Sequence, residues 1–178
     1  MYSKLNSFGF LGIDAFMVQV EVDISQGMPS FDIVGLPDAT VKESRDRIRA
    51  SLKNNNYNVP MSRITVNLAP ADIKKIGSMY DLPILIGILI STKQLEGNFE
   101  DSAFIGEISL FGDVKKVYGI LPMVLKAKEM GIKNIYIPQQ IFSWSGCFHK
   151  GVWMLPQKDA FHLQIQLQQR LPLSDPIL

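Results

Sequence analysis

The chain has 178 residues, of which 47% are hydrophobic and 20% are charged. Because a chain of this length can bury a substantial core, we expect one compact globular domain. The 18 Lys and Arg residues are balanced by 17 Asp and Glu residues, and the net charge of +1 excludes a global field that would attract nucleic acid. Any nucleic-acid binding would therefore need a local basic patch.

Cysteine and histidine are too scarce for two common structural devices. The single Cys147 cannot form an intrachain disulfide, and one Cys with two His cannot supply a zinc site of four side-chain ligands. Residues 1–7 lack the apolar stretch of a signal peptide, and the longest apolar run, 82–90, is about half of the roughly 20 residues that cross a bilayer. We therefore expect a cytoplasmic protein with no metal site and no contact with a membrane.

Two extended segments open the predicted fold. In 17–24, Val and Ile alternate with Gln, Glu and Asp, which is typical of a strand with one solvated face. Turn-forming residues at 26–29 separate this strand from a second extended pattern at 31–34. The short connection predicts that the two strands are antiparallel neighbours at the start of a meander.

A helix is predicted to follow residues 35–40. Its apolar face carries Val41, Ile48 and Leu52. Its basic face carries Lys42, Arg45 and Arg49. Two starting points compete, because Pro37 suits a first turn and Thr40 with Glu43 suits a capping box. The helix should end near the asparagines at 54–56.

A strand and a central helix come next along the chain. Residues 63–68 alternate again as a strand, which Pro70 should end. Asp81 is predicted to cap the following helix, 82–92, whose residues are apolar on nearly every side. Such a helix has to be covered by the rest of the protein, so we expect it at the centre of the domain.

Shorter elements are predicted for the second half of the chain. Segments 103–109 and 114–117 flank Phe-Gly-Asp at 111–113, a hairpin signal because Gly readily adopts positive φ. The elements expected after them are helix 119–130 with a C-cap at Gly131, strands 134–137 and 152–155, and helix 159–170. This mixture predicts an α+β domain over 1–170, with a mixed sheet and helices packed mainly on one face, and a linker that begins at 171–178.

Three stretches resemble the ComM/YifB family of Mg-chelatase-like AAA+ proteins. The first is VGLPDATVKESRDRIR at 34–49, and the second is RITVNLAPAD at 63–72, followed by YDLPI at 80–84. The third runs from GEISL at 106–110 to GIKN at 131–134 and is also similar to the proteolytic domain of Lon. The chain thus resembles the N-terminal Lon-protease-like domain of this family.

The resemblance implies a Lon-protease-like fold that is shared with a ribosomal protein domain. It also implies that an AAA+ module follows, which binds ATP and Mg²⁺, self-associates into rings and, in ComM-type members, supports DNA branch migration during natural transformation. No GxxxxGK[ST] phosphate-binding loop occurs in the present sequence. We therefore expect no cofactor and no ATPase activity in this segment.

The similarity to Lon raises the question of peptidase activity, which needs a Ser activated by a buried, neutral Lys. The Lon pattern places the nucleophile at Met79 and the lysine at Leu121, and neither side chain can perform that chemistry. A shifted pair of Ser78 with Lys115 or Lys116 is an alternative. We interpret these three residues as a turn serine and two solvated hairpin lysines, and expect no peptidase activity.

Two basic groups are candidate contacts for a partner or for nucleic acid. The first is the basic face of the helix after residue 40: Lys42, Arg45 and Arg49. Glu43 and Asp46 interrupt this face, so a solvated, salt-bridged surface is the simpler interpretation. The second group lies in the loop after Pro70: Lys74 and Lys75. Loops on a rigid scaffold often carry function, although loop lysines also serve solubility alone.

Three classes of function remain open at this point. The leading hypothesis is a non-catalytic assembly and partner- or substrate-binding domain of an AAA+ ATPase. The alternatives are a residual Lon-like Ser/Lys peptidase and a DNA-binding module, which the balanced charge disfavours. Trp144, Cys147 and Trp153 are interpreted as residues that pack under the last strand and not as cofactor ligands. The two histidines, His149 and His162, are isolated.

Overall fold

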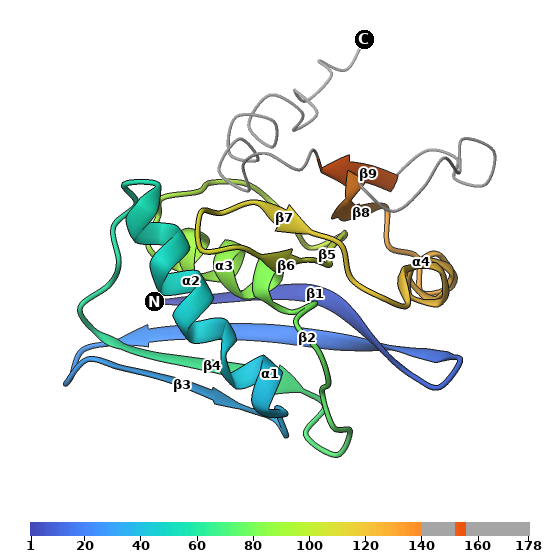
Figure 1. Ribbon diagram of the computed structural model, residues 1–178, viewed down its shortest axis with the longest axis horizontal. Coiled ribbons are helices and arrows are strands. Elements are labelled where there is room, and N and C mark those ends of the chain that lie inside the picture. Colours follow the sequence, from blue (N-terminus) through green and yellow to red (C-terminus); the bar gives the residue numbers. More distant parts are fainter. Residues whose placement is uncertain (140–151, 156–178) are drawn as a thin grey trace, which may run out of the picture.

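The computed structural model describes residues 1–139 and 152–155. Among these residues, seven strands form one mixed sheet in the order β3-β4-β2-β1-β5-β8-β9, and β6 and β7 form a separate hairpin (Figure 1). The strands are Tyr2–Leu11 (β1), Asp14–Ser25 (β2), Ser30–Val34 (β3), Arg63–Ala69 (β4), Ser102–Phe104 (β5), Glu107–Ile108 (β6), Val114–Lys115 (β7), Asn134–Pro138 (β8) and Val152–Leu155 (β9). The helices are Ala39–Lys42 (α1), Ser44–Asn54 (α2), Asp81–Ser91 (α3) and Ile120–Glu129 (α4). The α+β class is therefore confirmed.

Several predictions lie outside the described residues and are not tested. They concern the helix at 159–170, the linker from 171, the residues Trp144, Cys147, His149 and His162, and the side chain of Trp153, whose backbone alone is described. For 152–155 the structure confirms the predicted strand, which pairs in parallel with β8.

Strand β1 pairs with β2 in a long antiparallel hairpin that the sequence pattern did not reveal. The reason is that β1 buries polar residues, which conceals its alternation. Ser3 Oγ donates to the Gly87 carbonyl at 2.8 Å, and Ser7 Oγ donates to the Phe104 carbonyl at 2.9 Å. Because these hydroxyls find partners inside the protein, their burial costs little.

The predicted pairing of β2 with β3 is wrong. Strand β4 lies between them, antiparallel to β2 and parallel to β3. A parallel pair needs a crossover connection, and here α1 and α2 supply it between β3 and β4. The position of β3 therefore depends on α1 and α2, because the apolar face of these helices has to be buried while the chain returns from the end of β3 to the start of β4. As a result β3 becomes the outermost strand at one edge of the sheet.

The helix predicted after residue 40 is confirmed in its buried face and corrected at its start. Val41, Ile48 and Leu52 are all fully buried, as predicted. The first turn is capped by Asp38, whose carboxylate accepts the Val41 amide at 2.8 Å, and not by Thr40. A break at Glu43 then separates α1 from α2.

Helix α3 is the central element that its composition predicts. It packs on β1 and β2, and α2 packs on α3 from outside (Figure 1). The contact is close at Gly87, where an added Cβ would lie 2.7 Å from Val22 Cγ2. Helix α4 begins at Gly119 against the ring of Phe10, which lies on the sheet face opposite to Gly9. Among the described helices, α2 and α3 therefore lie on one side of the sheet.

The segment predicted as one strand, 103–109, is split. Its first part, β5, joins the main sheet between β1 and β8, and its second part, β6, pairs with β7. Gly112 in the hairpin turn has a φ of +90°, as the hairpin prediction requires. The split places Glu107 beside the loop that precedes α3, which matters for the site described next.

Candidate partner-binding site

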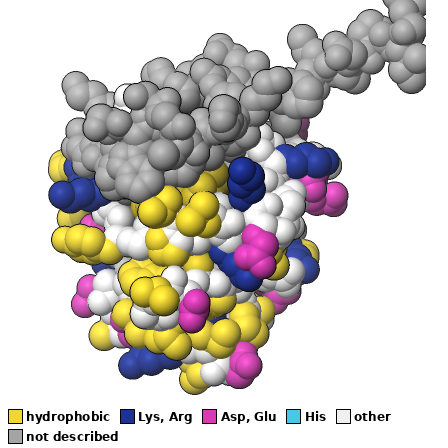
Figure 2. Space-filling view, turned by 90° about the vertical axis from the view of Figure 1, so that its right-hand side faces the viewer, with side chains coloured by type: hydrophobic (Ala, Val, Ile, Leu, Met, Phe, Trp, Pro, Cys, Tyr) yellow, Lys and Arg dark blue, Asp and Glu magenta, His cyan; other side chains and the backbone are white. Residues whose placement is uncertain are grey.

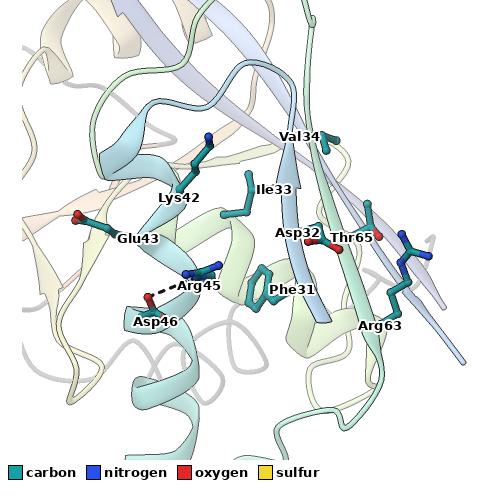
Figure 3. Close-up of a pocket in the computed structure, with 10 residues that line it drawn as sticks. All are labelled: Phe31, Asp32, Ile33, Val34, Lys42, Glu43, Arg45, Asp46, Arg63 and Thr65. Carbon is teal, nitrogen blue, oxygen red and sulfur yellow. Dashed lines mark ion pairs between the residues drawn. The ribbon is translucent and has the colours of Figure 1, made fainter. Parts of the chain in front are cut away.

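A groove of about 660 Å³ lies between the helix α1–α2 and the edge strand β3 (Figure 3). Its apolar lining consists of Phe31, Ile33 and Val34. Its basic residues are Lys42, Arg45 and Arg63. Its acidic residues are Asp32, Glu43 and Asp46. The groove therefore combines an apolar floor with charges of both signs.

The three basic candidates on the helix lie together beside this groove, and we call Lys42, Arg45 and Arg49 the basic wall. All three are exposed, because the opposite helix face is buried against the core. The Arg49 guanidinium carbon lies 5.5 Å from the centroid of the Phe31 ring, a cation–π distance. Arg45 Nε lies 3.5 Å from Asp46 Oδ2, and such an exposed ion pair contributes little. The predicted grouping of these residues is confirmed, whereas their role is a proposal.

The second basic group is divided by the fold, and the expectation for Lys75 is corrected. Lys74 is exposed, but Lys75 is fully buried and its ammonium donates a hydrogen bond to the Pro70 carbonyl. Burial lowers the pKa of Lys75, although the nearby Asp72 carboxylate raises it in part. Its backbone pairs with Leu36 and Asp38 at 3.0 Å each. Lys75 thus ties two loops together, and its charge is not accessible to a partner.

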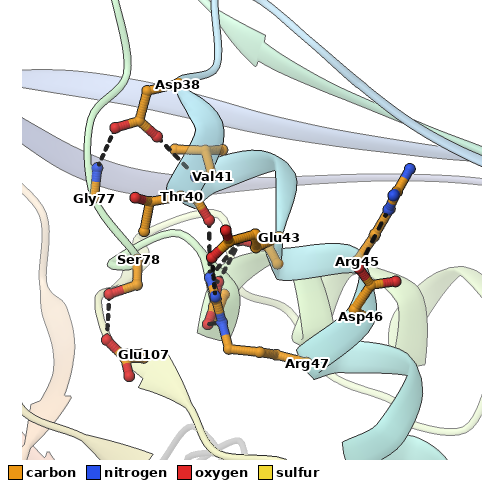
Figure 4. A network of polar contacts seen from close by, with 12 residues as sticks. Asp38, Thr40, Val41, Glu43, Arg45, Asp46, Arg47, Gly77, Ser78 and Glu107 are labelled. Carbon is orange, nitrogen blue, oxygen red and sulfur yellow. Dashed lines mark hydrogen bonds and ion pairs between the residues drawn. The ribbon is translucent and has the colours of Figure 1, made fainter.

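Neither the Lon positions nor their shifted alternative hold a Ser–Lys pair. Met79 is buried with 5% exposure, and Leu121 is half-buried. Ser78 Oγ donates to the Glu107 carboxylate (Figure 4), and Lys115 Nζ lies 3.2 Å from Asp113 Oδ2. Among residues 1–139, no Lys ammonium hydrogen-bonds to a Ser hydroxyl. The geometry of these residues does not provide the proton transfer that a Ser/Lys peptidase needs.

Asp81 does not cap α3 as predicted. The N-cap residue is Tyr80, and the Asp81 carboxylate is fully buried and turned toward α2. It accepts hydrogen bonds from Ser44 Oγ, from Arg47 Nε at 2.6 Å and from the Ile108 amide at 3.2 Å. We call Ser44, Arg47 and Asp81 the polar clamp, because they join α2, α3 and β6.

The charges of the polar clamp are matched by these contacts. Burial raises the pKa of Asp81, while the hydrogen bonds from Arg47 and Ser44 lower it in part. The hydrogen bond to Asp81 raises the pKa of Arg47. A second set of contacts lies nearby, where Asp38 accepts the Gly77 amide at 3.3 Å (Figure 4). The arrangement is a structural network in which the buried side-chain polar atoms of Ser44, Arg47 and Asp81 have hydrogen-bond partners.

The polar clamp was missed by reasoning from the sequence, although one signal was present. Ser44 and Arg47 are three residues apart on one helix face, and both fall in the stretch 34–49 that carries the family resemblance. Asp81 falls in the stretch 80–84. The resembling stretches are therefore the ones that meet in the folded domain.

Exposed hydrophobic residues also lie outside the groove. Figure 2 shows hydrophobic side chains gathered on one face, with charged side chains scattered among them. Over the described parts of the chain, no helix is long and apolar enough to cross a membrane, and no three or more His, Cys, Asp or Glu residues cluster as a metal site would need. Among the described residues, the groove is a hollow surface that combines apolar side chains with charges of both signs.

Comparisons with known proteins identify the family. Residues 20–141 match the model of the family described as subunit ChlI of Mg-chelatase. The chain is 45% identical to competence protein ComM of Haemophilus influenzae over 120 residues, which cover 67% of this chain and 24% of that protein. It is 44% identical to the uncharacterized protein YifB of Escherichia coli over 126 residues, 70% of this chain and 25% of that protein. The matches thus span about a quarter of the length of these relatives. The chain therefore belongs to the family of subunit ChlI of Mg-chelatase, and it is related to ComM and YifB.

Proposed function

We propose that this chain is a non-catalytic assembly and partner-binding domain of a Mg-chelatase-like AAA+ protein of the ComM/YifB type, with a Lon-protease-like fold. The observation that carries the proposal is the groove between β3 and the basic wall, an open surface with defined charge. The Lon nucleophile and lysine positions are occupied by Met79 and Leu121, which supports a role in binding.

The proposal extends to the parent protein. One relative is named a competence protein, and we propose a related role here, in which the domain supports DNA branch migration during transformation. ATP and Mg²⁺ would be bound by an AAA+ module of the parent, and the domain would help to order its subunits in a ring. In this proposal the groove is open to solvent because it binds a partner, whereas the residues of the polar clamp bond to one another and stabilise the domain.

Size-exclusion chromatography with light scattering tests the assembly role. The purified chain is run at low salt over a range of concentrations, alone and with a short DNA duplex. We expect a mass that rises with protein concentration, because a domain that orders subunits should have affinity for itself. A chain that stays monomeric at every concentration would remove the assembly role.

Two alternative functions are tested in parallel. Turnover of unfolded casein that Ser78→Ala abolishes would establish a peptidase. A DNA complex that weakens steeply with salt, and that substitution of all three residues of the basic wall by Ala removes, would establish a DNA-binding module. We expect neither result, because Ser78 is bonded to Glu107 and because acidic residues interrupt the basic wall.

A further inference from the structure

Strand β3 offers an open edge to the groove. In the sheet formed by the described residues, β3 has β4 as its neighbour on one side and no strand on the other. The groove is lined from both faces of β3, by Phe31 and Ile33 toward the helix and by Asp32 on the opposite side (Figure 3). It therefore wraps around the free edge, where unpaired backbone groups of an outer strand are available.

We infer that this groove binds an extended, acidic segment of a partner protein, which adds to the sheet as a strand beside β3. The inference rests on the proposed partner-binding function and names the chemistry and the mode of that binding. Main-chain hydrogen bonds to the edge would supply affinity, and the side chains that flank the strand would select the partner.

The basic wall supplies the selection for acidic residues. Figure 3 shows Lys42 and Arg45 pointing toward β3, whereas Glu43 points away from it. Glu43 is instead 3.5 Å from the guanidinium of Arg47. Asp46 also lines the groove and pairs with Arg45, but the three residues of the basic wall outnumber it, so the side of the groove that faces the helix keeps a net positive charge. Every second residue of an added strand would face this side, because side chains alternate between the faces of a sheet.

The floor of the groove fits a strand that is apolar as well as acidic. Phe31 is buried and Ile33 is half-buried, and both belong to the face of β3 that is turned toward the helix (Figure 3). Their register with Ile64 and Val66 of β4 continues this apolar row across the sheet. Short apolar side chains such as Val would extend the row by one strand, next to the heads of Lys42 and Arg45.

A second copy of this chain fits the edge poorly. Two β3 strands that pair over their full length about a two-fold axis would place Asp32, the middle residue of the strand, opposite its own copy. Like charges in direct cross-strand contact are destabilising. The same axis would also bring two basic walls together. A DNA duplex fits no better, because it has no ladder of donors and acceptors that continues a sheet.

A direct test uses a fluorescein-labelled peptide of about ten residues, the length of a long strand, in which every second position is Glu or Val in turn and the positions between them are Thr, so that Glu and Val share the face turned toward the helix. Fluorescence polarisation at low salt measures its affinity for the whole chain. Hydrogen–deuterium exchange then locates it, and we expect slower exchange at the amides of residues 30–34. Methylation of alternate peptide nitrogens should abolish binding, because it removes the donors of the added strand.

Charge reversal in the basic wall makes the test specific. We expect Lys42→Glu with Arg45→Glu to raise Kd about tenfold, since two exposed charge pairs are replaced by repulsion. Lys116→Glu with Lys128→Glu is the matched control, because both residues are exposed on other elements and should leave Kd unchanged. A peptide with Lys in place of Glu should bind at least about tenfold more weakly.

Three results would overturn the inference: no binding, equal binding by the Lys peptide, or protection of amides away from β3. Competition by a DNA duplex for the same amides would assign the groove to nucleic acid. None of these results changes the light-scattering outcome that tests assembly, and a monomeric chain that binds the peptide would retain the groove and lose only the assembly role.

Discussion

Two arginines on one helix, two residues apart, have opposite environments. Arg45 in the basic wall is exposed and pairs weakly with Asp46, whereas Arg47 in the polar clamp holds the buried carboxylate of Asp81. The helix turns by about 100° per residue, so that neighbours in the sequence face different surroundings. The stretch that resembles the family therefore contains both an exposed arginine, Arg45, and an arginine with a buried partner, Arg47.

The largest expected effect on stability comes from removing the buried charge of Asp81. We expect Asp81→Asn to lower the free energy of unfolding by about 3 kcal/mol, because Arg47 loses its partner and the site is shielded from water. The same change at Asp46, which is exposed, should cost less than about 0.5 kcal/mol. Urea unfolding of both variants measures the difference, and equal effects would show that the polar clamp does not stabilise the domain.

The turn that follows β3 should be nearly as sensitive. Gly35 has a φ of +95°, and an added Cβ would lie 2.2 Å from the Leu68 carbonyl oxygen. We expect Gly35→Ala to cost about 2 kcal/mol or more. Gly12 has a φ of +65° and open space around it, so Gly12→Ala should cost only about 1 kcal/mol. Thermal unfolding of the pair separates the steric effect from the effect of φ.

The buried Lys75 should also make the stability of the domain depend on pH, whereas the exposed Lys74 should not. Because the folded state lowers the pKa of Lys75, its favourable contribution to stability is complete above the usual lysine pKa and is lost as the pH falls through the lowered value. Relative to Lys75→Met, the wild-type chain should therefore lose stability as the pH falls from above that usual value toward neutral. Lys74→Met should show no such trend. A pH-independent difference between the wild type and Lys75→Met would contradict the assigned burial.

The smallest expected effect concerns Ser51 on the inner face of α2. Its hydroxyl is buried and has no hydrogen-bond partner among the described residues. We expect Ser51→Ala to stabilise the domain by about 0.5 kcal/mol, because Ala favours a helix and leaves no polar group unpaired. Calorimetry measures the change, and a clear loss of stability would reveal a partner for this hydroxyl.

Much of the secondary structure could be predicted because alternation and helical periodicity are local. They indicated β2, β4, the buried face of α2 and the covered helix α3. Strand β1 was missed because Ser3 and Ser7 satisfy their hydroxyls inside the core, so the polar residues of that strand do not mark its solvated face. The positions of the basic wall were also predictable, since helical spacing alone places them on one face.

By itself, the sequence determined the α+β class, the family and the lack of a Ser–Lys pair at the Lon positions. Only the tertiary structure decided that β4 separates β2 from β3, that Lys75 and Asp81 are buried, and that β3 has an open edge. Periodicity reports which side of an element is apolar, but not which element covers it. The partners of Lys75 and Asp81 come from other segments, at Pro70 and Arg47, so their environments exist only after the chain has folded.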